Sequence, residues 1–373
     1  MPRSDEAKRA VVVLDSGEPT ADHERATQRK LAEHLAHLLG CPYLEPTQAP
    51  RASDHYYYLA PQTLTEPQRY AALGIRSERD LFGGLVSQPF MATKSISHPR
   101  LATGYFPPGW SDDFARQASS ALLKGYTVFS KQDAREAARL LLAEGAVRVK
   151  PVRATAGRGQ HVIEQLHELE PLLGDMDERQ LMIWGLALEE NLLDVETLSV
   201  GQVRVAGITC SYHGIQHLTH DHQGTEVYAG SELLVVRGGY EALLQLPLDE
   251  HLRLAVTQAL TYEQAAQHCL PGFIASRRNY DIARGVNARG HLRSGVLEQS
   301  WRPGGASSAE VLALQAFADD PALQQVRASS HEVFGTFHLP RDSTLFYQGQ
   351  DSELGQFSKY AQIHGHDHSE RHR

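Results

Sequence analysis

The fold is decided by residues 276–305, which read SRRNYDIARGVNARGHLRSGVLEQSWRPGG. Two runs typical of strands flank the polar turn at residues 287–290, with Asp281 on the first arm and Glu298 on the second. Arms of nearly equal length bring the two carboxylates close together across an antiparallel pair. Neighbouring carboxylates repel each other unless a cation or a proton lies between them. The sequence therefore predicts a metal ion at Asp281 and Glu298, with surface residues of a plain hairpin as the alternative.

Arginines lie at both ends of this stretch. Arg302 opens the loop Arg-Pro-Gly-Gly after the second arm, and its planar fork suits a phosphate or a substrate carboxylate. Pairing of Arg302 with Glu298 is a structural alternative. Arg277 and Arg278 precede Asp281 and are candidates for stabilising charge during group transfer, with arginines that merely flank a strand as the alternative. A metal ion beside an anion-binding loop is the arrangement that phosphoryl chemistry needs.

Length and composition bound the remaining possibilities. A chain of 373 residues exceeds what a single hydrophobic core usually covers, so we expect two or three domains. The net charge of −9 gives no support for a nucleic-acid surface. Apolar runs are too short for a membrane span, and the polar N-terminus is not a secretory signal. Three scattered cysteines suit a reducing compartment, so we expect a cytoplasmic protein.

A second motif lies upstream of the hairpin. A strand at residues 126–129, a helix after Ser130 and a strand at residues 146–151 lead to Lys150 and then to a glycine-rich loop at residues 154–159. Glycines allow backbone N–H groups to approach an anion, and a lysine adds a point charge. The pattern predicts a phosphate-binding hairpin made by Lys150, Gly157, Arg158 and Gly159. A strand-end lysine that reaches solvent is the alternative.

Acidic residues follow the apolar run at residues 181–188. Glu189 and Glu190 end this run, and Glu196 follows after a short gap. A carboxylate at the end of a buried strand can accept hydrogen bonds from ribose hydroxyls. We therefore expect a nucleotide here, with a solvated turn as the alternative. No GxGxxG motif follows the first predicted strand at residues 10–14, so a dinucleotide fingerprint is absent.

Two histidine-rich segments give weaker signals. His213, His217, His220 and His222 lie close together in the sequence, but no further spaced ligand supports zinc, so we expect a loop or a substrate-pocket role. Residues 322–332 are expected to form a short helix. The residues from Tyr347 onward lose apolar periodicity, and the last ten residues are expected to be disordered, so residues 341–373 are expected to form a partly disordered tail.

In the order of these predicted units and motifs along the chain, the sequence resembles the ATP-grasp superfamily over roughly residues 10–317. The resemblance implies an α/β fold with α+β lobes: a Rossmann-like pre-domain (1–115), a first lobe (116–190), a second lobe with the metal site (191–340) and the tail (341–373). It also implies a bacterial branch of that superfamily.

The resemblance assigns a role to each motif. Met91-Ala-Thr-Lys is similar to the segment that carries an early nucleotide-contacting lysine, here Lys94. The other implied roles are Lys150 on a phosphate, residues 154–159 as a mobile loop, Glu189 and Glu190 at the adenine hinge, and Glu196 on the ribose. Asp281 and Glu298 would hold Mg²⁺ or Mn²⁺. The superfamily usually has Glu-x-Asn at the second carboxylate, whereas this sequence has Glu298-Gln-Ser300.

The implied activity is ATP-dependent ligation of a small-molecule carboxylate to an amine through an acyl phosphate. A small-molecule kinase on the same frame is one alternative. A nucleotide-binding regulatory protein without turnover is another, because a serine hydroxyl at Ser300 is a weaker metal ligand than an asparagine carbonyl. Dimers are frequent in the superfamily, so a homodimer is among the expected states.

Overall fold

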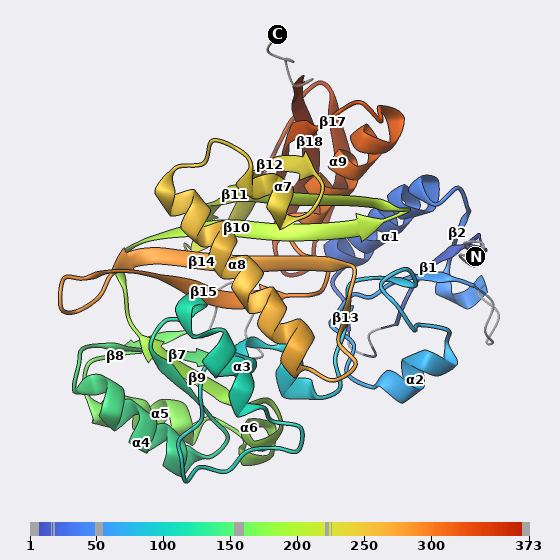
Figure 1. The fold of residues 1–373 in the computed structure, drawn as a ribbon. Coiled ribbons are helices and arrows are strands. Elements are labelled where there is room, and N and C mark those ends of the chain that lie inside the picture. Colours follow the sequence, from blue (N-terminus) through green and yellow to red (C-terminus); the bar gives the residue numbers. More distant parts are fainter. Residues whose placement is uncertain are drawn as a thin grey trace.

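The protein is described by a computed structural model over residues 7–15, 17, 19–48, 55–152, 160–220, 224 and 226–367. Three sheet-based units follow one another along the chain (Figure 1). This order is the one that the ATP-grasp resemblance implies, and it confirms the predicted α/β fold class. In the described ranges, no helix has the length and apolar character needed to cross a membrane.

The N-terminal unit is a small parallel sheet in the order β2-β1-β3-β4. Its strands consist of apolar and aromatic residues; β1, β3 and β4 are buried almost throughout, whereas the edge strand β2 is half-buried. The elements are β1 Val11–Val13, α1 Asp22–Leu38, β2 Tyr43–Leu44, η1 Pro46–Gln48, β3 Tyr57–Leu59, α2 Pro67–Ala72, β4 Leu81–Phe82 and β5 Gly84–Leu85. The predicted β-α-β opening is therefore confirmed.

The first lobe is an antiparallel sheet in the order β6-β9-β7-β8, covered by α4. Ser130 caps α4 by accepting a hydrogen bond of 3.0 Å from the backbone N–H of Asp133. The apolar stripe of α4 packs against β7 and β9. The lobe contains β6 Gly125–Val128, α4 Lys131–Leu142, β7 Val147–Pro151, β8 His161–Ile163, η5 Leu166–Glu168, α5 Leu169–Gly174, α6 Glu178–Trp184 and β9 Leu186–Glu190.

A segment of short helices connects these two units. It consists of η2 Pro89–Ala92, η3 Lys94–Ile96, α3 Asp112–Gln117 and η4 Ser119–Ala121. The side chain of Thr93 caps η3 by accepting a hydrogen bond from the Ser95 N–H. Both Lys94 and His98 are buried here, so this segment carries polar groups into the interior.

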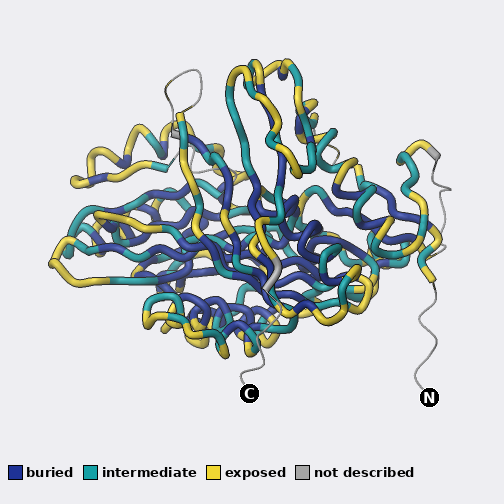
Figure 2. The backbone as a smooth tube through the Cα atoms, turned by 90° about the horizontal axis from the view of Figure 1, so that it is seen from above, coloured by how far each residue is buried: buried dark blue, intermediate teal, exposed yellow. Residues whose placement is uncertain are grey.

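The second lobe is an eight-stranded sheet in the order β15-β14-β10-β11-β12-β16-β18-β17, and its strand pairs are antiparallel. Helix α8 crosses one face over β14 and β10 (Figure 1), whereas α9 and α1 pack against the other face. The elements are β10 Leu193–Val205, β11 Ile208–His220, β12 Glu226–Arg237, α7 Tyr240–Leu244, α8 Glu250–Cys269, β13 Ile274–Ala275, β14 Arg277–Val286, β15 Leu292–Ser300, α9 Ser307–Asp319, β16 Gln325–Phe334, β17 Ser343–Asp351 and β18 Gly355–Asp367. Figure 2 shows that buried residues follow the strands, whereas exposed residues gather at loops and hairpin tips.

Two predictions for the C-terminal part were wrong. Residues 322–332 do not form a helix, because Gln325–Phe334 is strand β16. Residues 343–367 are not a tail, because β17 and β18 complete the large sheet. The α1 residue His23 holds β17 in place through a bond of 2.8 Å between its Nδ1 and Asp351 Oδ2. These strands escape a periodicity search because polar residues alternate with only a few aromatic ones.

Candidate functional site

The hairpin β14–β15 brings two carboxylates together as predicted. Asp281 lies directly opposite Glu298, and the strand register shifts immediately after this pair. Asp281 Oδ1 accepts a hydrogen bond of 2.5 Å from Gln216 Nε2 of β11. Glu298 Oε2 accepts one of 2.9 Å from Lys94 Nζ of η3. The segment before the first lobe therefore provides a cation at the carboxylate pair.

The donor set fits a hard cation that completes its coordination with ligand oxygens. Within the described residues, no cluster of three or more His, Cys, Asp or Glu side chains is arranged to hold a metal ion. Two carboxylates and neutral oxygens are what Mg²⁺ uses when phosphates supply its other ligands. Asp281 and Glu298 therefore suit a metal that arrives with a nucleotide, whereas a site made entirely of protein ligands does not fit.

Burial and then the charge of Glu298 raise the pKa of Asp281 to about 6. In the unfolded chain, an aspartate has a pKa of about 3.9. The folded protein thus binds the proton of Asp281 more tightly than the unfolded chain does. Ionisation of this carboxyl group opposes folding, because the charge is partly desolvated beside a second carboxylate.

The pH dependence of stability follows from this shift. Without divalent ions, the contribution of Asp281 to the free energy of unfolding is largest below about pH 4 and is lost as the pH rises through about 6. We expect Asp281→Asn to remove a decrease of about 2 kcal/mol between these pH values. Chemical denaturation at pH 4.5 and 7.5 measures the difference, with the exposed Asp319→Asn as control. Equal pH profiles for Asp281→Asn and the wild type would contradict the burial of this charge.

A buried network lies on the inner side of the first lobe. Lys150 Nζ donates hydrogen bonds to Glu189 Oε1 at 2.6 Å and to the Leu297 carbonyl at 3.1 Å. His98 Nε2 lies 3.1 Å from the other oxygen, Glu189 Oε2. Burial opposes ionisation of Glu189, but Lys150 and His98 outweigh it and lower the pKa of Glu189 to about 2. Lys150 and Glu189 thus form an ion pair within the first lobe, and the bond from Lys150 to the Leu297 carbonyl connects this pair to β15.

The two lysines keep donors for a ligand. An ammonium group has three N–H donors. Among the described residues, Lys150 uses two of them and Lys94 uses one. Both side chains are at most 2% exposed, so they are fixed point charges at the carboxylate pair rather than solvated surface groups. Gly157, Arg158 and Gly159, which were predicted to act with Lys150, lie outside the described residues.

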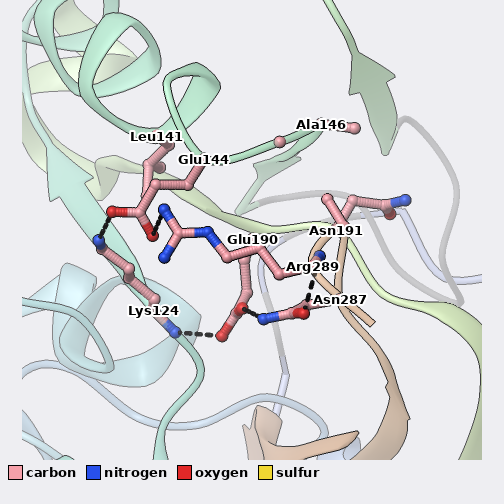
Figure 3. Close-up of a pocket in the computed structure, with 10 residues that line it drawn as sticks. Lys124, Leu141, Glu144, Ala146, Glu190, Asn191, Asn287 and Arg289 are labelled. Atoms are coloured by element: carbon pink, nitrogen blue, oxygen red, sulfur yellow. Dashed lines mark hydrogen bonds and ion pairs between the residues drawn. The ribbon is translucent and has the colours of Figure 1, made fainter. Parts of the chain in front are cut away.

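Glu190 does not face this network, contrary to the role predicted for it. Its carboxylate accepts hydrogen bonds from the Lys124 N–H and Arg293 Nε, both 3.0 Å, and from Asn287 Nδ2 at 3.3 Å. The bonds from Asn287 (Figure 3) and Arg293 join the first lobe to the tip of the β14–β15 hairpin. Glu190 therefore has a structural role, whereas its neighbour Glu189 points inward because side chains alternate along β9.

The tip of the hairpin is also packed tightly against the first lobe. Glu144 bonds to Lys124 Nζ and lies 3.7 Å from Arg289 of the hairpin turn (Figure 3). A Cβ atom added at Gly145 would lie 2.3 Å from the Cβ of Ala288. Gly145 also has a φ of 153°, so both conformation and space require glycine there.

Strand alternation places two other predicted residues on the α8 face of the large sheet. Arg278 points toward α8, where its Nε donates to Glu263 Oε1 at 2.6 Å. Glu196 also lies on the α8 side, with His251 Nε2 at 3.4 Å. Asp281 lies on the opposite face, toward α9. Arg278 and Glu196 therefore lie on the face of the sheet away from the carboxylate pair, and their charge-stabilising and ribose-binding roles stay predictions.

Arg277, unlike Arg278, lies on the same face of the large sheet as Asp281. Its guanidinium binds both oxygens of Glu310 from α9, at 2.9–3.1 Å. It also donates to Ser300 Oγ at 3.1 Å and to the Arg302 carbonyl at 2.6 Å. Arg277 thus fixes the start of the Arg-Pro-Gly-Gly loop.

Arg302 itself has a guanidinium that is largely uncommitted. Its NH1 donates to the Pro303 carbonyl at 2.9 Å, and no described carboxylate lies within ion-pair distance. Burial lowers the pKa of Arg302, although Glu298 and Asp281 lie near enough to oppose this. The predicted structural pairing with Glu298 is absent among the described residues, so the fork of Arg302 can bind an anion beside the carboxylates.

Sequence reasoning missed His98 and Asn279. His98 follows Lys94 by four residues in an irregular segment, and no sequence pattern marks it as a partner of Glu189. Asn279 could have been noticed, because it precedes Asp281 by two residues and therefore shares its face of the strand. In the histidine-rich stretch, His217 pairs with Glu232 at 3.3 Å, and His222 lies outside the described residues.

The chain matches the model of one protein family, and its structure is similar to distant solved structures. The model of the family described as Protein of unknown function (DUF3182) matches residues 11–361. No curated protein matches the sequence. The structure is similar to D-alanyl-alanine synthetase A from Vibrio cholerae O1 biovar eltor, with 11% identity, a TM-score of 0.47 and coverage of 80% of this chain and 90% of that chain. It is also similar to phosphoribosylamine–glycine ligase from Thermotoga maritima, with 11% identity, a TM-score of 0.46 and coverage of 97% and 93%. Both relatives are too distant to assign a reaction.

Proposed function

The chain belongs to the DUF3182 family, and from its own residues we propose that it is an ATP-dependent ligase that joins a carboxylate to an amine. The observation that carries this proposal is the meeting of two buried lysines with a carboxylate pair. Lys94 bonds to Glu298, and Lys150 bonds to the backbone of the preceding residue, Leu297. Fixed cations beside carboxylates are the arrangement that holds a nucleotide triphosphate together with a divalent ion.

The residues divide the task between them. Asp281 and Glu298 would hold Mg²⁺ or Mn²⁺, which supplies charge neutralisation at the phosphates. The free N–H donors of Lys94 and Lys150 would bind phosphate oxygens. Because these side chains are held by their own partners before any ligand arrives, little reorganisation is needed at the moment of reaction.

Arg302 would orient the carboxylate substrate. One substrate oxygen attacks the γ-phosphorus, the bond to the β-phosphate oxygen breaks, and ADP leaves. The amine nitrogen then attacks the acyl carbon, inorganic phosphate leaves with the bonding pair, and the nitrogen loses a proton. Neither step needs a nucleophile from the protein, so positioning and electrostatics supply the acceleration.

Nucleotide binding is the first test. We expect ATP with Mg²⁺ to raise the free energy of unfolding by about 2.7 kcal/mol at a concentration 100 times Kd, because the ligand binds only the folded chain. A thermal-shift series with ATP, GTP and AMP, with and without Mg²⁺, measures this. Absence of any stabilisation by ATP and Mg²⁺ would overturn the proposal.

The reaction class needs a second measurement. In a screen of small carboxylates and amines, a ligase releases phosphate only when both substrates are present. Release of ADP with a stable phosphorylated product would instead identify a kinase. Tight ATP binding without ADP formation under any substrate pair would identify a nucleotide-binding protein without turnover.

A further inference from the structure

Four oxygen-bearing side chains form a square on the α9 side of the hairpin. Asp281 lies opposite Glu298, and Asn279 lies opposite Ser300. Residues two positions apart on a strand share a face, so the second pair stands beside the first. The contacts confirm this: Asn279 bonds to Ser199, which is the partner of Asp281 on β10.

The amide of Asn279 is held in one orientation. Its Nδ2 donates to Ser199 Oγ at 2.6 Å and to the Tyr212 hydroxyl at 3.2 Å. The Tyr212 hydroxyl donates its own hydrogen to Glu310 at 2.6 Å, so it can accept the one from Asn279. Both amide hydrogens are therefore used, and the orientation of Oδ1 follows from them.

The carbonyl oxygen of this amide has no hydrogen-bond donor in the described part of the chain. Asn279 is only 7% exposed, yet its Oδ1 is not among the fully enclosed side-chain atoms that lack a partner, so part of this oxygen is open to a ligand. An unpartnered amide oxygen beside two carboxylates is a neutral, hard ligand. It adds a coordinating atom without a third negative charge in a place where burial already raises the pKa of Asp281.

The hydroxyl of Ser300 is committed differently. Ser300 Oγ accepts a hydrogen bond from Arg277 NH1 at 3.1 Å and directs its own hydrogen to the Arg302 carbonyl at 3.3 Å. These contacts tie Ser300 to Arg277 of β14 and to the loop that follows β15. Ser300 is thus engaged in holding this loop, whereas the oxygen of Asn279 has no such engagement.

We propose that Asn279 Oδ1 is the third protein ligand of a divalent cation of the Mg²⁺ class, together with Asp281 and Glu298. This inference rests on the proposed nucleotide function, because two carboxylates and one amide leave the remaining positions to phosphate oxygens and water. Asn279 of β14 supplies the neutral ligand, and it lies directly opposite Ser300 of β15. The serine at position 300 therefore does not weaken the site.

Cation binding by matched variants tests this assignment. Free Mn²⁺ is followed by electron paramagnetic resonance in the presence of ATP, for the wild type, Asn279→Leu, Asn279→Asp and Ser300→Ala. We expect Asn279→Leu to weaken Mn²⁺ affinity about 10-fold or more, since changes around a metal site typically cost 10–100-fold. Asn279→Asp keeps a ligating oxygen, so this variant should bind Mn²⁺ clearly more tightly than Asn279→Leu does. Ser300→Ala should stay within about threefold of the wild type.

The outcomes separate this inference from the proposed function. A wild-type chain that binds neither ATP nor Mn²⁺ overturns both. Wild-type binding that Asn279→Leu leaves unchanged, or that only Ser300→Ala weakens, overturns the ligand assignment alone. If Asn279→Leu does not fold, wild-type crystals grown with ADP and Mn²⁺ decide the matter: an anomalous peak about 2.0–2.2 Å from Asn279 Oδ1 supports the assignment. A peak bound to the carboxylates but out of contact with Oδ1 overturns it.

Discussion

Replacing Glu298 with glutamine is expected to abolish Mg²⁺-dependent ATP turnover, with a loss of about 100-fold or more. The substitution removes one charge from the carboxylate pair and leaves the buried Lys94 ammonium without its anionic partner. The side chain of Glu298 is 39% exposed, so the fold should tolerate an amide there. ADP formation across a Mg²⁺ titration measures the effect, and circular dichroism verifies the fold.

Glu232→Gln is a matched control for this experiment. Glu232 lies on the same sheet but is exposed, and its one ion pair among the described residues is with His217. Its substitution should leave turnover and the Mg²⁺ requirement unchanged. Wild-type turnover in Glu298→Gln would remove this residue from the site and with it the interpretation of the hairpin as a metal-binding element.

Replacing Arg277 with methionine is expected to lower the free energy of unfolding by about 3–5 kcal/mol. The side chains of Arg277 and Glu310 are 1% and 0% exposed, so the variant leaves a buried carboxylate without its cation. Restoring charge balance should reverse most of the loss, because apolar side chains can replace a buried ion pair at little cost. The double variant Arg277→Met, Glu310→Leu is therefore expected to be more stable than the single variant.

Urea denaturation of the single and double variants measures this coupling. Arg289→Met is the control, since Arg289 is 56% exposed at the hairpin turn and should change stability by less than about 1 kcal/mol. Equal destabilisation in the single and double variants would contradict a buried ion pair. Arg277 also holds Ser300 and the Arg302 carbonyl, so we expect the single variant to weaken ATP binding as well.

The sequence predicts the parts of this protein that depend on local pattern. The β14–β15 hairpin follows from its two arms and turn, and the opposition of Asp281 and Glu298 follows from the lengths of those arms. The first lobe follows from the cap at Ser130 and the apolar stripe of α4. These features require only residue spacing, which the sequence contains in full.

Features that depend on the face of a strand are predicted less well. Arg277 and Arg278 are adjacent and chemically equal, yet one contacts α9 and the other contacts α8. Deciding between them requires the register relative to Asp281, which places odd-numbered residues of β14 on one side. The same rule would have found Asn279 and placed Glu196 on the other face. His98 cannot be found in this way, because Glu189 is 91 residues away in the sequence and His98 lies in an irregular segment without a strand or helix period.

The contacts at the tip of the hairpin have a mechanical consequence. The contacts of Glu190 with Asn287 (Figure 3) and with Arg293 fasten the tip to the first lobe, while Asp281 and Glu298 lie opposite each other farther along the hairpin. Any opening between the lobes must then either break these bonds or turn about them as a pivot. Lys150 belongs to the first lobe, and its hydrogen bond to the Leu297 carbonyl crosses to the second lobe. If the lobes opened by turning about the hairpin tip, Lys150 would move away from the carboxylates.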